Sequence, residues 1–376
     1  MPDPIRVLHV VGAMNRGGVE SWLMALLRHA DRSEIAMDFL VHTNSRAAYD
    51  DEILARGSHV IACPSQRSPG YLRAFSNALA RHGRYDVLHS HVHWFSGVTT
   101  TLARRRGIPV RIAHSHSDTR SVETASTWLR SGYCALMRRA IQASATHLLA
   151  ASEPAADALF GSNREERHRA SVVYCGLDFS AFSPANHASH RASVRQEFGI
   201  EPDEVVIGHV GAFHAPKNHS FLCSLASCAA RRERRLRVLC AGAGPLEHQV
   251  RKQFAQAGIR AILTGLRPDV PRLLCGMDVF VFPSLYEGLP LAVIEAQAAG
   301  LPCIVSTAVT PEVEAVPGLI HRLALEAGPD QWAESALASA KLPRRPASSV
   351  EALRESPFDV ERSFARVRAI YQGRSS

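Results

Sequence analysis

Glu287 and Glu295 are the two residues of this chain whose type and spacing point most directly to chemistry. They stand eight positions apart in the segment PSLYEGLPLAVIE, which predicts a loop that leads into a helix. The unpaired N–H groups of a helix start, with those of the turn at Gly288 and Leu289, form an anion site that needs no metal. A carboxylate near bound phosphate is repelled unless it accepts hydrogen bonds from neutral hydroxyl groups, such as those of sugars and riboses. The segment therefore predicts a site for a nucleotide sugar.

The helix that positions these carboxylates is predicted to begin at Pro290, because proline suits the first helical position. Good helix formers follow over residues 291–299, and Gly300 ends the run. Glu287 then lies just before the helix, and Glu295 lies more than one turn inside it. The alternative interpretation is an ordinary buried helix whose carboxylates are solvated.

A charged group of opposite sign, Lys217, stands in the segment GAFHAPKNH after a predicted strand, where an α/β sheet presents its loops to ligand. Lysine occurs at only three positions of the chain, which makes this one conspicuous. Gly17 and Gly18 stand between another predicted strand and helix, where the absence of side chains lets the backbone approach a phosphate closely. The alternative for this glycine pair is a simple turn.

Histidines cluster in the first half of the chain, at positions 89, 91, 93, 114 and 116. His114 and His116 face the same side of a predicted strand and could form a metal pair. We expect no zinc site, because no third ligand with characteristic spacing and no nearby cysteine completes one. The alternative for both residues is a contact to backbone or acceptor.

The elements that must hold these groups alternate between strand and helix. Short apolar runs rich in leucine and valine predict the strands of parallel sheets buried on both faces. In the first half these runs are residues 5–11, 36–41, 59–62, 87–90, 110–115 and 147–151. In the second half they are residues 205–211, 236–241, 261–264, 279–282 and 303–306. The chain is expected to form two α/β sheets.

The length of 376 residues exceeds what one hydrophobic core usually serves, so two domains are expected. The segments 177–184 and 187–193 are predicted as the linker between them, and the segment 343–349 as a surface loop. Residues 358–371 have the spacing of a final helix.

No apolar run approaches the roughly 20 residues that span a bilayer. Arg6 and His9 interrupt the first apolar stretch, so we expect no secretion signal and a cytoplasmic protein. The eight cysteines include no Cys-x-x-Cys pair and are interpreted as small buried hydrophobic residues.

The net charge of +8 comes almost wholly from arginine. A basic balance fits nucleic acid, an anionic membrane face or phosphorylated substrates, but the spacing of an RNA-binding motif is absent. Basic side chains on or beside predicted helices are either solvated helix ends or contacts to lipid headgroups or a lipid diphosphate. These are Arg104, Arg105, Arg106, Arg130, Arg138 and Arg139.

The segment around Glu287 and Glu295 resembles the retaining glycosyltransferases of the GT-B fold, specifically the large family whose hallmark is Glu-x7-Glu. Pro-Ser-x-x-Glu-Gly-Leu-Pro, followed by Ile-Glu-Ala and Ala-Gly-x-Pro, carries the likeness. The resemblance implies GT-B architecture, with two Rossmann-like domains facing across a cleft and a final helix that crosses back to the first domain. It assigns residues 1–185 to the acceptor, residues 186–355 to the nucleotide sugar and residues 356–376 to the returning helix.

In the resembled family, a Gly-Arg-(x)n-Lys segment neutralises the departing diphosphate, and Gly211 and Lys217 match it. Ala212 stands where the family has arginine. The loss of one cation gives up stabilisation of about 2–4 kcal/mol. Three explanations are open: Arg267 or His214 supplies the charge, the helix end suffices, or the protein is slow or inactive. We favour compensation.

The resemblance also implies a role for each remaining site residue. The Gly-Gly-Val-Glu loop faces the donor diphosphate, and a histidine, either His114 or His116 with His114 preferred, lies close to the transferred sugar. The implied donor contacts are Gly17, Gly18, Gly244, Leu266 and Arg267 in loops, Gly288, Leu289 and Pro290 at the diphosphate, Glu287 at the donor sugar and Glu295 at the ribose.

Together these motifs imply a metal-independent retaining enzyme without a cofactor. It would move a sugar from a nucleoside diphosphate sugar, with uridine diphosphate preferred, to a saccharide or lipid-linked acceptor. Val-Gly-x-Phe-x-x-x-Lys-Asn-His and Arg-Ile-Ala-His-Ser-His resemble enzymes of exopolysaccharide or capsule synthesis, which implies peripheral contact with the inner membrane surface. Two alternatives are a nucleotide-sugar-binding protein without transfer activity, to which Ala212 points, and a nucleic-acid-binding protein, to which only the charge points. No nucleic acid partner is expected.

Overall fold

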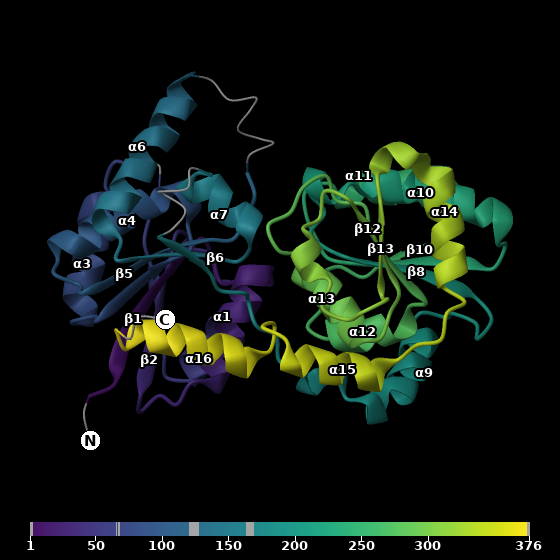
Figure 1. Cartoon of the computed structure of the whole chain (residues 1–376), viewed down its shortest axis with the longest axis horizontal. Helices are drawn as coiled ribbons and strands as arrows, with labels where there is room; N and C mark the ends of the chain where they lie inside the picture. Colours follow the sequence, from purple (N-terminus) through teal and green to yellow (C-terminus); the bar gives the residue numbers. More distant parts are fainter. Residues whose placement is uncertain (1–2, 65, 67, 120–127, 163–168, 374–376) are drawn as a thin grey trace. The chain divides into compact units, whose positions relative to one another are not determined.

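The computed structural model describes residues 3–64, 66, 68–119, 128–162 and 169–373. The chain divides into two compact units: unit 1 is Met1–Gly176 with Val360–Ser376, and unit 2 is Leu177–Asp359. Each unit is built on one parallel sheet covered by helices (Figure 1). The prediction of two α/β sheets is confirmed.

Unit 1 holds a seven-stranded sheet in the order β3-β2-β1-β4-β5-β6-β7. Its strands are β1 Ile5–Val11, β2 Ile35–Val41, β3 Val60–Ala62, β4 Val87–Ser90, β5 Val110–Ser115, β6 His147–Ala150 and β7 Ala170–Val172. Its helices are α1 Gly18–His29, α2 Asp50–Ala55, α3 Tyr71–His82, α4 Ser96–Arg105, α6 Trp128–Ser144, α7 Glu153–Phe160 and α16 Val360–Tyr371.

Two faces of this sheet are covered differently. Helices α3, α4, α6 and α7 pack on one face, where strand residues such as Leu8 and Leu88 meet helix residues such as Phe75. Helices α1 and α16 cover the other face (Figure 1). The indole of Trp22 on α1 donates to the Ser363 hydroxyl on α16 at 3.1 Å, which ties the end of the chain to unit 1.

Unit 2 holds a six-stranded sheet in the order β10-β9-β8-β11-β12-β13. Its strands are β8 Val205–Val210, β9 Leu236–Ala241, β10 Ala261–Leu263, β11 Val279–Phe282, β12 Cys303–Ser306 and β13 Ile320–Leu323. Its helices are α9 His187–Glu197, α10 His219–Arg232, α11 Glu247–Gln256, α12 Val270–Gly276, α13 Leu291–Ala298, α14 Gly328–Ser339 and α15 Pro346–Glu355. Helices α10, α11 and α14 share one core with the sheet, and α9 and α15 pack on α12 and α13.

Strand order decides where a ligand binds such a sheet. In both units the order reverses once, between β1 and β4 and between β8 and β11. Ligands of open α/β sheets bind at the carboxyl ends of the strands at this switch point, because the flanking loops part there to opposite faces. The residues that follow β1 and β4 in unit 1, and β8 and β11 in unit 2, are therefore candidates for ligand binding.

The structure differs from the sequence-based expectations in two short strands and in two polar segments. The short strands β7 and β13 were not predicted, because each is only partly buried and carries polar residues. The predicted linker 187–193 is part of α9, and the predicted loop 343–349 contains the start of α15, where Ser349 is fully buried. In both segments tertiary packing selects a helix that the polar composition did not indicate.

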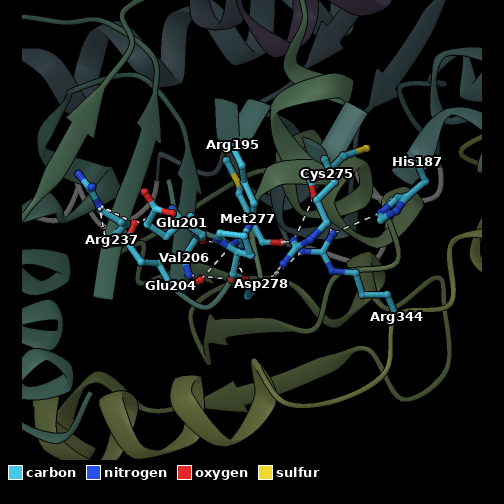
Figure 2. Close-up of polar contacts among 12 residues, drawn as sticks. His187, Arg195, Glu201, Glu204, Val206, Arg237, Cys275, Met277, Asp278 and Arg344 are labelled. Atoms are coloured by element: carbon cyan, nitrogen blue, oxygen red, sulfur yellow. Dashed lines mark hydrogen bonds and ion pairs between the residues drawn. The ribbon is translucent and has the colours of Figure 1, made fainter. Parts of the chain in front are cut away.

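An ion-pair network holds α9 and the chain before α15 to the sheet of unit 2 (Figure 2). The Asp278 carboxylate accepts from Arg191 at 2.6 Å, from Arg195 at 2.7 Å and from the N–H of Val206 at 2.8 Å. Arg344 lies 3.6 Å from the same carboxylate, and burial together with the neighbouring Arg191 lowers the pKa of Arg344 to about 10. One carboxylate thus organises three guanidinium groups.

Candidate functional site

The switch point of unit 2 brings together two residues singled out by the sequence. Lys217 follows β8 and Glu287 follows β11, and the Lys217 ammonium donates to the Glu287 carboxylate at 2.6 Å. Both side chains are largely buried, with 20% and 13% of their surface exposed. The ammonium also lies 4.8 Å from the ring centroid of Phe282, the last residue of β11. The two opposite charges therefore form one neutral, largely buried pair at the carboxyl edge of the sheet.

The local sequence explains why Lys217 points into this site. Ala215–Lys217 form a single 3-10 turn with proline at its start, and Asn218 ends the turn in the left-handed conformation with φ of 53°. Asparagine tolerates this conformation better than most residues. The N–H of Leu285 donates to the carbonyl of Pro216 at 2.8 Å, which joins this turn to the loop that carries Glu287.

Glu295 lies in the second turn of α13, on the partly exposed side of the helix. Burial of its carboxyl group raises its pKa from 4.5 to about 7. The helix begins at Leu291, with Pro290 in the preceding capping position and no side chain that caps the helix start. The Glu295 carboxyl group is thus partly protonated near pH 7. It lies one turn after the start of α13, whose first N–H groups have no side-chain cap.

The glycine turns of unit 2 have a packing role. A Cβ on Gly244 would lie 2.6 Å from the carbonyl oxygen of Phe213, and one on Gly242 would overlap the carbonyl oxygen of Gly211. Only glycine lets the loops after β8 and β9 lie so close together. A Cβ on Gly211 would be 3.3 Å from the Lys217 side chain. These glycines let the loop that carries Lys217 pack against the loop that follows β9.

The structure places both residues that could replace the cation missing at Ala212. Arg267 donates to both carboxylate oxygens of Asp269 at 2.8 Å and lies 3.1 Å from Glu197, so its charge is balanced twice over. His214 and Ala212 itself are both exposed. Leu266, beside Arg267, is 52% exposed. Arg267 is therefore already paired within unit 2, whereas the exposed His214 side chain makes no ion pair with the residues that the structure describes.

In unit 1 the glycine loop lies at the corresponding switch point. Gly17 occupies the capping position of α1 in extended conformation, and Gly18 is the first helical residue. Neither contributes a side chain, so the start of α1 has no side-chain cap. Burial raises the pKa of Glu20, which lies in the first turn of α1. A Cβ on Gly17 would overlap the carboxylate of Glu20. Sequence reasoning did not single out Glu20, although its place three residues after a glycine cap was visible.

The two candidate histidines differ in accessibility. His114 on β5 is fully buried, and its Nδ1 lies 3.0 Å from Nε2 of His89. His116, just after β5, is partly exposed, with Nε2 at 2.9 Å from Nδ1 of His91 and Nδ1 at 3.7 Å from the Cys175 sulfur. Burial lowers the pKa of both, that of His116 to about 3, so both are neutral at physiological pH. Of the two candidates, His116 is therefore the more accessible and His114 is fully buried.

Comparison with known proteins gives two family matches. A model described as Glycosyltransferase Family 4 matches residues 16–181, and one described as Glycosyl transferases group 1 matches residues 204–340. The chain is 37% identical over 373 residues to EpsF of Bacillus subtilis strain 168, which is named as a glycosyltransferase; the match covers 97% of this chain and 96% of EpsF.

Two further similarities are weaker in sequence. The UDP-Gal:alpha-D-GlcNAc-diphosphoundecaprenol alpha-1,3-galactosyltransferase of Escherichia coli is 27% identical, over 61% of this chain and 59% of that protein. The crystal structure of Anabaena HepE in complex with UDP and glucose superposes with a TM-score of 0.78 at 16% identity, covering 96% of this chain and 98% of HepE. The structural likeness supports the GT-B fold, and the predicted fold class is confirmed.

Proposed function

The chain belongs to the family 4 glycosyltransferases, and we propose that it is a retaining enzyme that transfers a sugar from a uridine diphosphate sugar to a saccharide or lipid-linked acceptor. Its product would be part of an exopolysaccharide, a capsule or a related glycan. The likeness to EpsF supports this class of product, and the names of the Escherichia coli and Anabaena proteins support a uridine carrier.

The observation that carries the proposal is the pair formed by Lys217 and Glu287 at the switch point of unit 2. When a donor binds, the Lys217 ammonium would turn to the diphosphate, and the Glu287 carboxylate would accept from hydroxyl groups of the sugar. The start of α13 would hold the same diphosphate through its backbone N–H groups. Glu295 would accept from the ribose. The pair keeps both charges balanced until a ligand that needs both signs replaces it.

The proposed transfer needs no metal at the leaving group, because one ammonium and one helix start oppose its charge. The acceptor oxygen forms a bond to the anomeric carbon while the bond from that carbon to the diphosphate oxygen breaks. A leaving phosphate oxygen takes the proton of the acceptor, so no enzymatic nucleophile is required. Glu287 and Glu295 therefore act as hydrogen-bond acceptors and not as the nucleophile and acid pair of a glycosidase.

Contact with a lipid-linked acceptor is supported by the surface of α6. Trp128, Leu129, Tyr133 and Leu136 expose between 43% and 81% of their surface. Exposed arginines accompany them on the same helix, at positions 130 and 139. Apolar side chains beside cations are the chemistry that binds an anionic lipid surface. No helix among the described residues is long and apolar enough to cross a membrane.

A donor screen tests the proposal. Thermal unfolding of the full chain would be measured with uridine, guanosine and adenosine diphosphate sugars, and selective stabilisation by uridine donors is expected. Transfer would then be followed to sugar and lipid-linked acceptors, with the anomeric configuration read by NMR. An inverted product would refute retention. Donor binding without transfer or hydrolysis on a broad acceptor panel would favour a binding protein, the function to which Ala212 points.

A further inference from the structure

Five histidines of unit 1 gather on one face of its sheet. They come from three adjacent strands: His9 is in β1, His89 in β4 with His91 just after it, and His114 in β5 with His116 just after it. His9 stands opposite His89 in the strand register, and alternate residues of a strand face the same side. Trp22 of α1 covers the group, with its ring centroid 5.3 Å from that of His114.

The rings form two chains of short nitrogen contacts. In the first, the Tyr371 hydroxyl lies 2.8 Å from Nδ1 of His89, whose Nε2 lies 3.0 Å from Nδ1 of His114. In the second, His116 contacts Nδ1 of His91 at 2.9 Å, and Nε2 of His91 lies 3.1 Å from Nδ1 of His9.

Each chain ends in a buried nitrogen without a hydrogen-bond partner among the described residues. These atoms are Nε2 of His114 and Nε2 of His9. A buried unpaired polar atom is costly and is often explained by a bound ion or water. The first chain therefore stops at a lone nitrogen of His114, whose ring stacks on His116 at 4.0 Å between centroids.

We propose that His91, His114 and His116 bind a divalent transition-metal ion of the zinc class. One ring nitrogen of each lies within 4.8 Å of the others. Tetrahedral bonds of about 2.0–2.1 Å place two ligand nitrogens roughly 3.3 Å apart. The 2.9 Å between the nitrogens of His91 and His116 would widen by a few tenths of an ångström, and the distances to the His114 nitrogen, which lie within 4.8 Å, would shorten.

The hydrogen bonds of the rings fit this assignment. If His114 binds the ion through Nε2, its Nδ1–H donates to His89, and the Nδ1–H of His89 can donate to Tyr371. If His91 binds through Nδ1, its Nε2–H donates to His9. If His116 binds through Nε2, its Nδ1–H points to the Cys175 sulfur. Metal-binding histidines almost always donate their second N–H in this way, which fixes ring orientation.

A second triad, His9 with His89 and His91, is less suited to an ion. His9 and His89 are fully buried, whereas His91 and His116 are partly exposed and leave a path for an ion to enter. An ion needs such a path to reach its ligands. The proposed site also explains the unpaired nitrogen of His114, which the second triad does not include.

Sequence spacing could not indicate this proposed site, for a physical reason. The third proposed ligand, His91, follows β4, and only the pairing of β4 with β5 brings it beside His114 and His116. The proposed ion would tie the ends of these two strands together beneath α1. This role is structural, and the leaving group of the proposed transfer is opposed by Lys217 in unit 2.

The test is metal binding by the full-length chain. The protein would be stripped with a chelator, titrated with Zn²⁺ or Co²⁺, and analysed for bound metal and for the visible spectrum of Co²⁺. We expect one equivalent, with the spectrum of a nitrogen-ligated tetrahedral site and no thiolate charge-transfer band. His91→Gln, His114→Gln and His116→Gln should each abolish this binding. His9→Gln, which removes a supporting contact, should weaken it about 10–100-fold.

The matched control is His248→Gln, an exposed histidine on α11 of unit 2, which should bind metal as the parent chain does. If variants within the cluster unfold, the Co²⁺ spectrum of the unaltered chain still decides the question. No stoichiometric binding, a thiolate band, or full binding by the three ligand variants would overturn the proposal. The cluster would then be a hydrogen-bonded imidazole network without an ion.

Discussion

The ammonium of Lys217 and the carboxylate of Glu287 lie 2.6 Å apart although 70 positions separate them in the chain. The two residues follow adjacent strands at the switch point of unit 2, and each is largely buried. Each therefore balances a charge that would otherwise be unpaired in a poorly solvated place. A ligand that brings both phosphate and hydroxyl groups can replace this pair without leaving either charge uncompensated.

Removing either member should impair transfer. Lys217→Ala is expected to lower kcat about 10²–10³-fold, because the departing diphosphate loses its one ammonium. Glu287→Ala should abolish measurable transfer, because it removes the acceptor for sugar hydroxyls. Both variants should remain folded by circular dichroism. Lys252→Ala, an exposed lysine on α11, is the control and should keep full activity. Full activity of Lys217→Ala or Glu287→Ala would refute the assigned roles.

Glu295 should make the stability of the donor-free protein depend on pH. The unfolded carboxyl group ionises near 4.5, but the folded one stays neutral until about pH 7. Between these values the unfolded state releases more protons, so the free energy of unfolding falls as pH rises, by up to roughly 3 kcal/mol. Urea denaturation at pH 5 and pH 8 would measure this difference. Glu295→Gln should flatten the profile; an equal slope in the variant would show that another group titrates.

Donor affinity should change in the opposite direction. An ionised Glu295 accepts hydrogen bonds from ribose hydroxyls more strongly than a neutral acid. Binding of a uridine diphosphate sugar should therefore tighten as pH rises from 6 to 8, measured by calorimetry at constant ionic strength. The effect should vanish in Glu295→Gln. An unchanged pH dependence in that variant would place the ribose contact elsewhere.

Asp278 should be a stability residue of unit 2. Asp278→Ala leaves Arg191 and Arg195 without their common carboxylate, and removing one partner of a buried ion pair typically costs about 3–5 kcal/mol. Asp330→Ala is the matched control, because this exposed carboxylate also meets two arginines, and should cost less than about 1 kcal/mol. Equal losses in urea denaturation would mean that burial of the network is unimportant.

Ala212 offers a gain-of-function test. Ala212→Arg restores the cation that the family carries, at an exposed position that needs no repacking. If missing charge limits the reaction, kcat should rise by roughly 30-fold or more, because such a group supplies about 2–4 kcal/mol. Arg267→Ala should leave kcat nearly unchanged, because Asp269 and Glu197 already balance that arginine. A large loss in Arg267→Ala would instead identify it as the compensating cation.

The contact of α6 with lipid can be measured directly. The full chain should sediment with vesicles that contain anionic phosphatidylglycerol and less with neutral phosphatidylcholine vesicles. Leu129→Glu combined with Leu136→Glu should abolish this binding, since both side chains are exposed on α6. Leu54→Glu, an exposed leucine on α2, is the control. Equal binding of the α6 variant and the parent would exclude this surface.

Most central strands were predictable because a parallel strand buried on both faces is a short, continuous apolar run. β1, β4, β5, β9, β11 and β12 begin and end where those runs do. The edge strands β7 and β13 lack this signal because fewer of their residues are buried. The first residues of α9 are polar and were expected to form a linker. They are helical because α9 packs against α12, and a local sequence pattern does not reveal such a contact.

The sequence by itself determined the α/β class, the helix after Glu287, and the lysine and glutamates that mark unit 2, since these depend on local composition and spacing. Only the tertiary structure decided which of these groups meet. It paired Lys217 with Glu287, occupied Arg267 with Asp269, and buried His114 while His116 stays partly exposed. The physical reason is that strand order and register bring together residues that are far apart in the sequence. Their contacts and burial then set their protonation state and their accessibility to ligand.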